Sequence, residues 1–251
     1  MTYIQNCEKH RDTIKNNFSS AQCVEEFLSP EEIAQLSLLQ FQLADRLKWT
    51  RTSNNIQPIC NIDEIFNKMP ILDKKFTELL GDYHKNHTGN YYITTQLHDL
   101  HVDLLTEEEC NNEQYSWTKN VIPYKSVVIP LMISENANAH TVFYKQRHIG
   151  YSITLDKAGV SEQKDSMYHL SRDYPIFETV DIQGEYNVKP LTPHIPKENS
   201  EGLEVENVFE FMVGDVMVFD SCQIHASCVT RSNPNYKWLK SGMNIQFYKE
   251  I

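Results

Sequence analysis

A chain of 251 residues, 40% of them hydrophobic, can bury a real core in one large domain or two small ones. Its formal net charge of −11 argues against a broad nucleic-acid-binding face. The longest apolar run, residues 127–133, is far too short to cross a bilayer. The N-terminus has no apolar signal-peptide core, so we expect a cytoplasmic location. The six cysteines form no Cys-x-x-Cys pair, which predicts free thiols and argues against a zinc ribbon.

The first 90 residues are expected to be largely helical. Residues 1–23 are polar and poorly periodic, which predicts a frayed extension. A helix should then begin at Ser29-Pro30-Glu31-Glu32, because serine can cap, proline suits the first helical position and Glu32 completes a capping box. Apolar residues at steps of three or four carry this helix to about Lys48. A second helical segment is predicted over residues 62–83, interrupted near Pro70, and both should pack outside a sheet.

From residue 91 the pattern changes to short strands. They are expected at residues 91–105, 121–133, 141–144, 151–154, 205–212, 216–219, 226–230 and 243–248. Many short strands behind a helical segment predict a mainly β fold, a jelly roll or other double-sheet barrel, with helices packed on one sheet. We expect a single domain over residues 1–251, with residues 91–251 as its β core.

Two connections between these strands carry further predictions. The short polar link between residues 216–219 and 226–230 predicts a β-hairpin. Residues 155–204 are polar and long, and an insert of that length inside a compact domain is usually functional. We therefore expect this insert to form a lid or a wall of the substrate site.

One pair of side chains predicts a metal site. In a regular strand alternate residues share a face, so His101 and Asp103 point the same way, whereas the neighbours His98 and Asp99 point apart. His225 lies at the start of a distant predicted strand, a rigid position that suits a metal ligand. Two histidines and one carboxylate match the facial triad of non-haem Fe(II) oxygenases, which leaves three coordination positions open.

The order of these motifs resembles the Fe(II)/2-oxoglutarate-dependent oxygenase superfamily. The resemblance rests on His101-Val102-Asp103, on the strands at 125–131 and 141–143, and on the run from Gly214-Asp215 to His225. Residues 27–32 are also similar to the start of the prolyl-hydroxylase and phytanoyl-type members. The resemblance covers roughly residues 24–251, apart from the insert.

That resemblance implies a double-stranded β-helix that uses Fe(II) and 2-oxoglutarate. It implies a dioxygenase that splits 2-oxoglutarate to succinate and CO2 while it oxidises a substrate, usually by hydroxylating a C–H bond. Halogenating relatives have a small residue in place of the carboxylate, so the carboxylate at Asp103 favours hydroxylation. Its implied partners are O2 and a small-molecule or peptide substrate, and no membrane.

In this family an arginine on the strand after the distal histidine usually binds the far carboxylate of 2-oxoglutarate. Lys240 stands at the matching place, with Gly242 where a small hydroxyl residue is common. Lysine offers a point charge and not a planar fork, which departs from the usual pattern. Arg231, six residues beyond His225, is the alternative cation.

Several alternatives stay open at this stage. Tyr92, Tyr124 and Tyr144 are either pocket hydrogen-bond donors or aromatic core residues. A jelly-roll binding module without catalysis would have the same predicted fold. A cupin-type metalloenzyme that does not use 2-oxoglutarate would also have a metal, although such sites usually contain more histidines.

Overall fold

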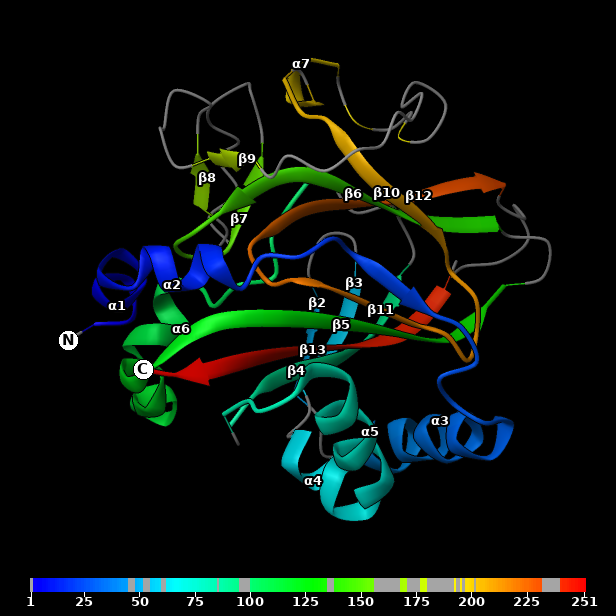
Figure 1. The fold of residues 1–251 in the computed structure, drawn as a ribbon. Helices are drawn as coiled ribbons and strands as arrows, with labels where there is room; N and C mark the ends of the chain where they lie inside the picture. The colour runs from blue at the N-terminus through cyan, green and yellow to red at the C-terminus, as the bar shows by residue number, and fades with distance from the viewer. Residues whose placement is uncertain are drawn as a thin grey trace.

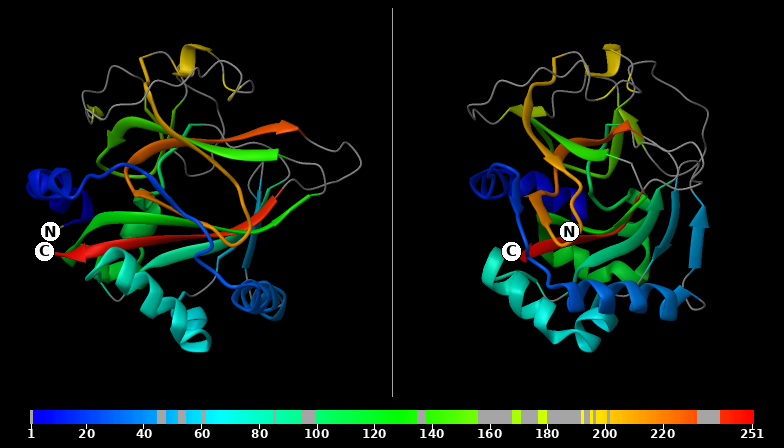
Figure 2. Two further views of the ribbon diagram at one scale, coloured as in Figure 1. Left: turned by 45° about the vertical axis from the view of Figure 1, so that its right-hand side comes forward. Right: turned by 90° about the vertical axis from the view of Figure 1, so that its right-hand side faces the viewer.

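Two β-sheets lie one above the other, with helices beneath the larger sheet (Figure 1). The computed structural model describes residues 2–44, 48–51, 55–59, 62–84, 86–94, 100–134, 138–155, 168–170, 177–179, 192, 195, 197–200, 202–231 and 240–251. Figure 2 shows the same two layers from two further sides. The mainly β architecture expected from the sequence is therefore confirmed.

The larger sheet has seven described strands, and every neighbouring pair is antiparallel. Strand β13 lies at its centre and pairs with β5 on one side and β4 on the other. In spatial order the strands are β1 (Gln22–Val24), β11 (Val216–Asp220), β5 (Val121–Ile133), β13 (Lys240–Glu250), β4 (Thr88–Thr94), β3 (Asn55–Ile59) and β2 (Lys48–Arg51).

The smaller sheet contains the strand that carries His225. Strand β6 is its centre and pairs antiparallel with three others, in a sheet of β10 (Val205–Glu210), β6 (Asn138–His148), β12 (Gln223–Arg231) and β9 (Phe177–Thr179). A short parallel pair joins β7 (Ile153–Leu155) and β8 (Tyr168–Leu170).

The helices beneath the larger sheet confirm the predicted start and interruption. Helix α3 (Pro30–Ala44) is preceded by a complete capping box: the Ser29 amide donates to Glu32 Oε2 at 2.7 Å, and the Glu32 amide donates to Ser29 Oγ at 3.3 Å. Helices α4 (Ile62–Lys68) and α5 (Pro70–Leu80) follow, and the second begins at the predicted proline. Their apolar faces pack against the sheet in one buried cluster.

The predicted end of α3 is wrong. The helix ends at Ala44, and Lys48 is already the first residue of β2. Pairing of β2 with β3 extends the sheet here, so tertiary pairing overrides the apolar periodicity that favoured a longer helix.

The N-terminal segment is ordered, contrary to the expected frayed extension. It forms α1 (Tyr3–Lys9), α2 (Arg11–Asn16) and strand β1. Thr2 and Gln5 form a capping box at the start of α1. Tyr3, Cys7 and Ile14 are at most 2% exposed and belong to a core cluster. Short helices of this kind are held by packing, which local periodicity does not reveal.

The predicted hairpin is also wrong. Strand β11 pairs with β5 in the larger sheet, whereas β12 pairs with β6 in the smaller one. The connection at Ser221 and Cys222 therefore crosses from one sheet to the other. This crossing places His225 on the smaller sheet, facing the larger one.

A buried cluster of charges holds this crossing together. Arg147 of β6 is fully buried, and its Nε donates to Asp220 Oδ2 at 3.0 Å while its Nη2 donates to Glu206 Oε1 at 3.1 Å. Lys125 of β5 also donates to Asp220, and Gln223 donates to Glu206. The cluster joins both sheets on either side of the turn before His225, and it satisfies its own buried charges.

Two predicted segments are described only in part. Strand β4 ends at Thr94, residues 95–99 lie outside the described ranges, and residues 100–105 form only an isolated bridge. In the insert, the structure describes β8, β9, α7 (Lys197–Ser200), residues 202–204 and the single residues 155, 192 and 195. The predicted lid or wall therefore stays a prediction.

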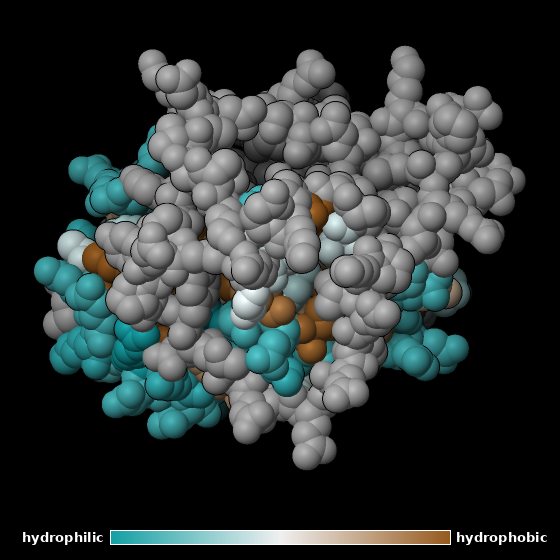
Figure 3. Space-filling model, turned by 90° about the horizontal axis from the view of Figure 1, so that it is seen from above, coloured by the Kyte–Doolittle hydropathy of each residue, from teal (hydrophilic) through white to brown (hydrophobic). Residues whose placement is uncertain are grey.

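Two short helices, α6 (Glu107–Asn111) and η1 (Glu113–Asn120), follow Asp103 in the chain and precede β5. No helix of the described chain has the length and apolar character needed to span a membrane. Seen from above, the coloured part of the surface has hydrophilic residues toward its margins and hydrophobic ones nearer the centre (Figure 3).

Candidate metal centre

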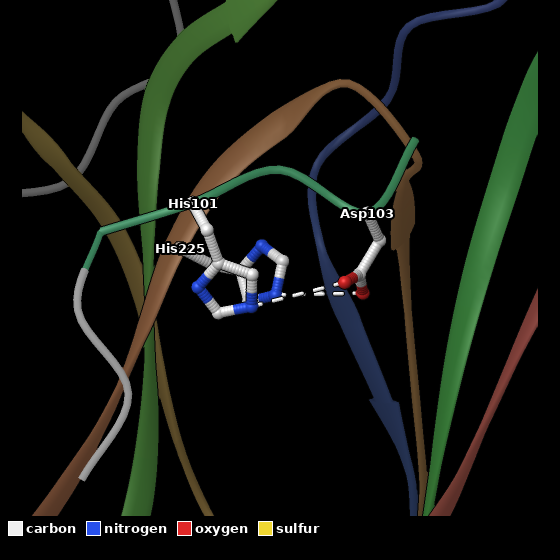
Figure 4. Close-up of side chains that lie close together, drawn as sticks. All are labelled: His101, Asp103 and His225. Carbon is white, nitrogen blue, oxygen red and sulfur yellow. Dashed lines mark ion pairs between the residues drawn. The ribbon is translucent and has the colours of Figure 1, made fainter. Parts of the chain in front are cut away.

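His101, Asp103 and His225 converge between the two sheets, as the sequence predicted. The candidate ligand atoms of all three lie within 4.8 Å of one another. His101 Nε2 lies 3.7 Å from Asp103 Oδ1, and His225 Nε2 lies 3.5 Å from Asp103 Oδ2. Figure 4 shows both imidazoles and the carboxylate pointing at a common space.

The spacing of the two histidines is set by the backbone. His101 and His225 form an antiparallel bridge in which each amide donates to the other carbonyl at 3.0 Å. Their ring centroids lie 4.2 Å apart. The segment around His101 thus makes a single strand-like contact with β12, which holds the pair in place without a regular strand.

His225 is held in a form that can bind a cation. Its Nδ1 lies 3.0 Å from the Gln223 carbonyl oxygen and donates to it, so the lone pair is on Nε2, which faces the other two residues. Burial lowers the pKa of His225 to about 4. His101 and Lys240 lower this pKa further, whereas Asp103 and the contact with the Gln223 carbonyl raise it. At neutral pH the ring is uncharged, so no proton competes with a metal for Nε2.

Aromatic rings enclose the same histidine. Phe143 of β6 stacks on His225 with centroids 5.8 Å apart, and the ring of Phe219 of β11 lies at 4.7 Å. Both phenylalanines are fully buried. They fix the ring orientation and exclude water from one side of the site.

Asp103 has a partner that the sequence analysis did not single out. Asn244 Nδ2 donates to Asp103 Oδ2 at 2.8 Å. In a regular strand that begins at Lys240, Asn244 shares the face of Lys240, which is the available sequence signal, but the contact depends on two distant segments meeting. A hydrogen-bonded carboxylate of this kind is common behind a metal ligand.

These three residues fit a divalent transition metal. Ligand atoms bound at about 2.1 Å to one ion are separated by roughly 3.0–4.2 Å, depending on the angle at the ion. The two histidine–carboxylate separations, 3.7 Å to Oδ1 and 3.5 Å to Oδ2 of Asp103, fall within that interval. Two imidazoles with one carboxylate favour Fe(II) over the hard cations Mg²⁺ and Ca²⁺, which take oxygen ligands.

Lys240 lies inside the fold at the start of β13. It is 3% exposed, its Nζ donates to Ser227 Oγ at 3.3 Å, and the ammonium lies 4.4 Å from the centroid of the Phe211 ring. Its charge is the smallest of the causes that act on the pKa of His225. The backbone of Arg231 pairs with Asn138, while its side chain is outside the described part of the structure.

Tyr92 occupies the space that Gly242 leaves. The two residues are directly opposite across β4 and β13. A Cβ added at Gly242 would lie 2.6 Å from the Tyr92 hydroxyl and 2.7 Å from the Ile129 carbonyl oxygen, so glycine is required for this close approach. Burial, aided by Asp103, raises the pKa of Tyr92, which keeps it a hydrogen-bond donor. A pocket role for Tyr92 therefore stays a prediction with a structural basis.

Tyr124 and Tyr144 belong to the packing of the fold. The Tyr124 hydroxyl donates to the Leu80 carbonyl oxygen at 2.8 Å, which links β5 to the end of α5. Tyr144 is fully buried in a core cluster. Of the cysteines, Cys7, Cys23, Cys110 and Cys222 are free thiols.

Comparisons with known proteins identify the fold. No protein-family model matches the sequence, and no curated protein does. Among solved structures, the non-heme alpha ketoglutarate dependent carbocyclase SnoK from nogalamycin biosynthesis aligns with a TM-score of 0.51 at 9% identity, over 99% of this chain and 86% of that one. The alpha ketoglutarate dependent epimerase SnoN from the same biosynthesis aligns with a TM-score of 0.50 at 8% identity, over 99% and 83%.

A prolyl-4-hydroxylase from Pseudomonas putida aligns more distantly, with a TM-score of 0.43 at 9% identity over 99% of this chain and all of that one. Identities this low establish architecture and not chemistry. The chain has the double-stranded β-helix fold of iron- and 2-oxoglutarate-dependent oxygenases. The predicted resemblance is confirmed at the level of the fold.

Proposed function

We propose that the protein is an Fe(II)- and 2-oxoglutarate-dependent dioxygenase that oxidises a C–H bond of its substrate, with hydroxylation the expected outcome. The observation that carries the proposal is the convergence of His101, Asp103 and His225 within 4.8 Å of one another. The fold supports it, since SnoK and SnoN are alpha ketoglutarate dependent enzymes by name. The buried cation Lys240, at the start of the next strand along the chain, also supports it.

In this proposal the chain's own residues bind and orient the reactants. His101, Asp103 and His225 hold the metal, and Lys240 pairs with the distal carboxylate of 2-oxoglutarate. Together, Fe(II), 2-oxoglutarate and O2 supply the oxidising power, with succinate and CO2 as by-products. Phe143 and Phe219 exclude water from beside His225, which protects the reaction from side paths. The substrate is a small molecule or a peptide.

The test is stepwise binding without oxygen. Purified protein is titrated first with Fe(II) and then with 2-oxoglutarate, and both affinities are measured by calorimetry. We expect one Fe(II) per chain, followed by one 2-oxoglutarate that binds only when the metal is present. His101→Ala and His225→Ala should abolish Fe(II) binding, while circular dichroism shows the fold retained. His84→Ala is the matched control, because His84 pairs with Glu250 away from the cluster.

Each negative result would indicate a different function for the protein. Tight Fe(II) binding without 2-oxoglutarate would favour a cupin-type metalloenzyme. No metal binding at all would favour a binding module without catalysis. If either histidine variant keeps full Fe(II) affinity, the ligand assignment is wrong. If both Fe(II) and 2-oxoglutarate bind as expected, succinate release measured with a panel of metabolites and peptides would identify the substrate class.

A further inference from the structure

The number of Asp103 oxygens that bind the metal determines how many coordination positions remain for other ligands. A facial triad with one carboxylate oxygen leaves three positions open on an octahedral ion. A chelating 2-oxo acid would take two of them, and the third would be left for O2. If both oxygens of Asp103 bound the ion, only two positions would remain, and the 2-oxo acid would fill both.

The position of the Asp103 carboxylate does not by itself determine whether one or both oxygens bind. Oδ1 lies 3.7 Å from His101 Nε2, and Oδ2 lies 3.5 Å from His225 Nε2. Both oxygens therefore lie close to the space between the histidines. Something other than the position of Asp103 must distinguish them.

Asn244 distinguishes them. Its Nδ2 donates to Oδ2 at 2.8 Å, and the amide orientation is fixed because a carboxylate can only accept. Asn244 lies on β13, the central strand of the larger sheet, paired on both sides. The donor is therefore on a rigid element, which a positioning residue requires.

A second observation concerns the other end of the same amide. Asn244 Oδ1 is buried and has no hydrogen-bond partner among the residues that the structure describes. A buried acceptor without a donor destabilises the protein. A water molecule bound beside Asp103 would supply the missing donor.

We propose that Asn244 is a positioning residue that confines Asp103 to binding the metal through Oδ1, and so keeps the third open position available to O2. The inference rests on the proposed function and deepens it. Asn244 acts through Asp103 and not on the substrate. Its loss should therefore leave the metal and the 2-oxo acid bound and block the small diatomic ligand.

The experiment uses nitric oxide as an O2 surrogate on the full chain. The anaerobic Fe(II)–2-oxoglutarate–protein complex is titrated with nitric oxide, and the adduct is followed by electron paramagnetic resonance. Asn244→Leu removes the donor at similar volume, and Asn244→Gln retains it. Gln246→Leu is the control on the same face of β13, because Gln246 bonds Thr88 and Tyr248 and not Asp103.

We expect Asn244→Leu to weaken nitric oxide binding by about tenfold or more, the usual effect of losing a hydrogen bond to a charged group. Its affinities for Fe(II) and 2-oxoglutarate should stay within about threefold of wild type. Asn244→Gln should recover most of the nitric oxide affinity, and Gln246→Leu should match wild type.

Unchanged nitric oxide binding in Asn244→Leu would overturn the inference and leave the proposed function standing. An equal loss in Gln246→Leu would overturn it too, since the effect would then belong to the strand. A wild-type protein that binds no 2-oxoglutarate would overturn the proposed function, and this inference with it.

Discussion

Lys240 is the residue whose chemistry departs most from what the family resemblance implies. An arginine would grip a carboxylate with a planar fork of two donors, whereas an ammonium offers a point charge with rotatable donors. The structure puts this ammonium inside the fold, where Ser227 and Phe211 already contact it. A buried cation is stabilised by an anionic ligand, so the distal carboxylate of 2-oxoglutarate suits this position.

Lys240→Ala should weaken 2-oxoglutarate binding strongly and Fe(II) binding little. Losing one buried charge-assisted contact costs about 2–5 kcal/mol, which corresponds to a 30-fold or larger rise in Kd by the same rough scale. Lys240→Arg should restore the charge imperfectly, because the longer planar fork does not match the site. Calorimetric titration of the Fe(II)-loaded variants measures both affinities.

Arg231→Ala is the control for this prediction. It should have the smaller effect on 2-oxoglutarate affinity. If Arg231→Ala damages binding and Lys240→Ala does not, the two roles are reversed. If both variants bind as wild type does, neither cation holds the diacid.

His148 predicts how stability depends on pH. It is 2% exposed on β6, and burial, with help from Arg11, lowers its pKa to about 4. The unfolded chain binds this proton near pH 6.5 and the folded chain does not, so stability is full above about 6.5 and is lost as pH falls toward 4. The loss from this residue approaches roughly 3 kcal/mol.

His148→Gln should flatten that part of the pH profile, because glutamine does not titrate. Urea unfolding of the metal-free protein at pH 7.5 and pH 5 gives the comparison. The difference between the two pH values should be smaller in the variant than in wild type. Equal differences would mean that other groups dominate the acid response.

At the residue scale, the sequence pointed to three candidate ligands that the structure brings together, although residues 100–105 form an isolated bridge and not the regular strand that the prediction assumed. Alternation chose His101 and Asp103 over His98 and Asp99, and position in a rigid strand chose His225. The contact of Asn244 with Asp103 could not be predicted, because it joins residues 141 positions apart in sequence. The fit of Tyr92 over Gly242 depends on strand register, which alternation alone does not specify.

At the scale of elements, local signals succeeded and non-local ones failed. The capping box at Ser29 and the proline at 70 marked their helices correctly, because both act within a few residues. The hairpin at 216–230 failed because strand partners are chosen by the whole sheet. The turn at Ser221 leads from one sheet to the other, and the buried charges around Asp220 hold the sheets there.

Arg147→Met tests the weight of this charge cluster. The change removes one buried cation and leaves Asp220 and Glu206 with an uncompensated charge, which should lower the free energy of unfolding by about 3–5 kcal/mol. Urea denaturation measures the difference. The neighbouring Lys145→Met is the control, since its partner Glu204 is 62% exposed and such a pair contributes about 1 kcal/mol or less.

A loss for Arg147→Met no larger than that for Lys145→Met would show that the cluster contributes little net stability. Because Asp220 and Gln223 flank the turn before His225, we also expect Arg147→Met to weaken Fe(II) binding. Unchanged Fe(II) affinity in a destabilised variant would show that the charge cluster stabilises the fold without positioning His225.

At the scale of the molecule, the sequence predicted a single domain with helices on one sheet, and the structure shows the two sheets and the helical layer (Figure 2). It missed the packing of the first 24 residues, because their two short helices and edge strand gain stability only from the rest of the fold. The substrate cannot be read from the fold, since one architecture carries many chemistries.

The most direct test is a crystal structure of the protein with Fe(II) and 2-oxoglutarate, grown without oxygen, with anomalous diffraction at the iron edge. We expect one iron peak bonded to His101, Asp103 and His225, with the distal carboxylate of 2-oxoglutarate against Lys240. An iron peak that lacks any of these three ligands, or a co-substrate held elsewhere, would contradict it.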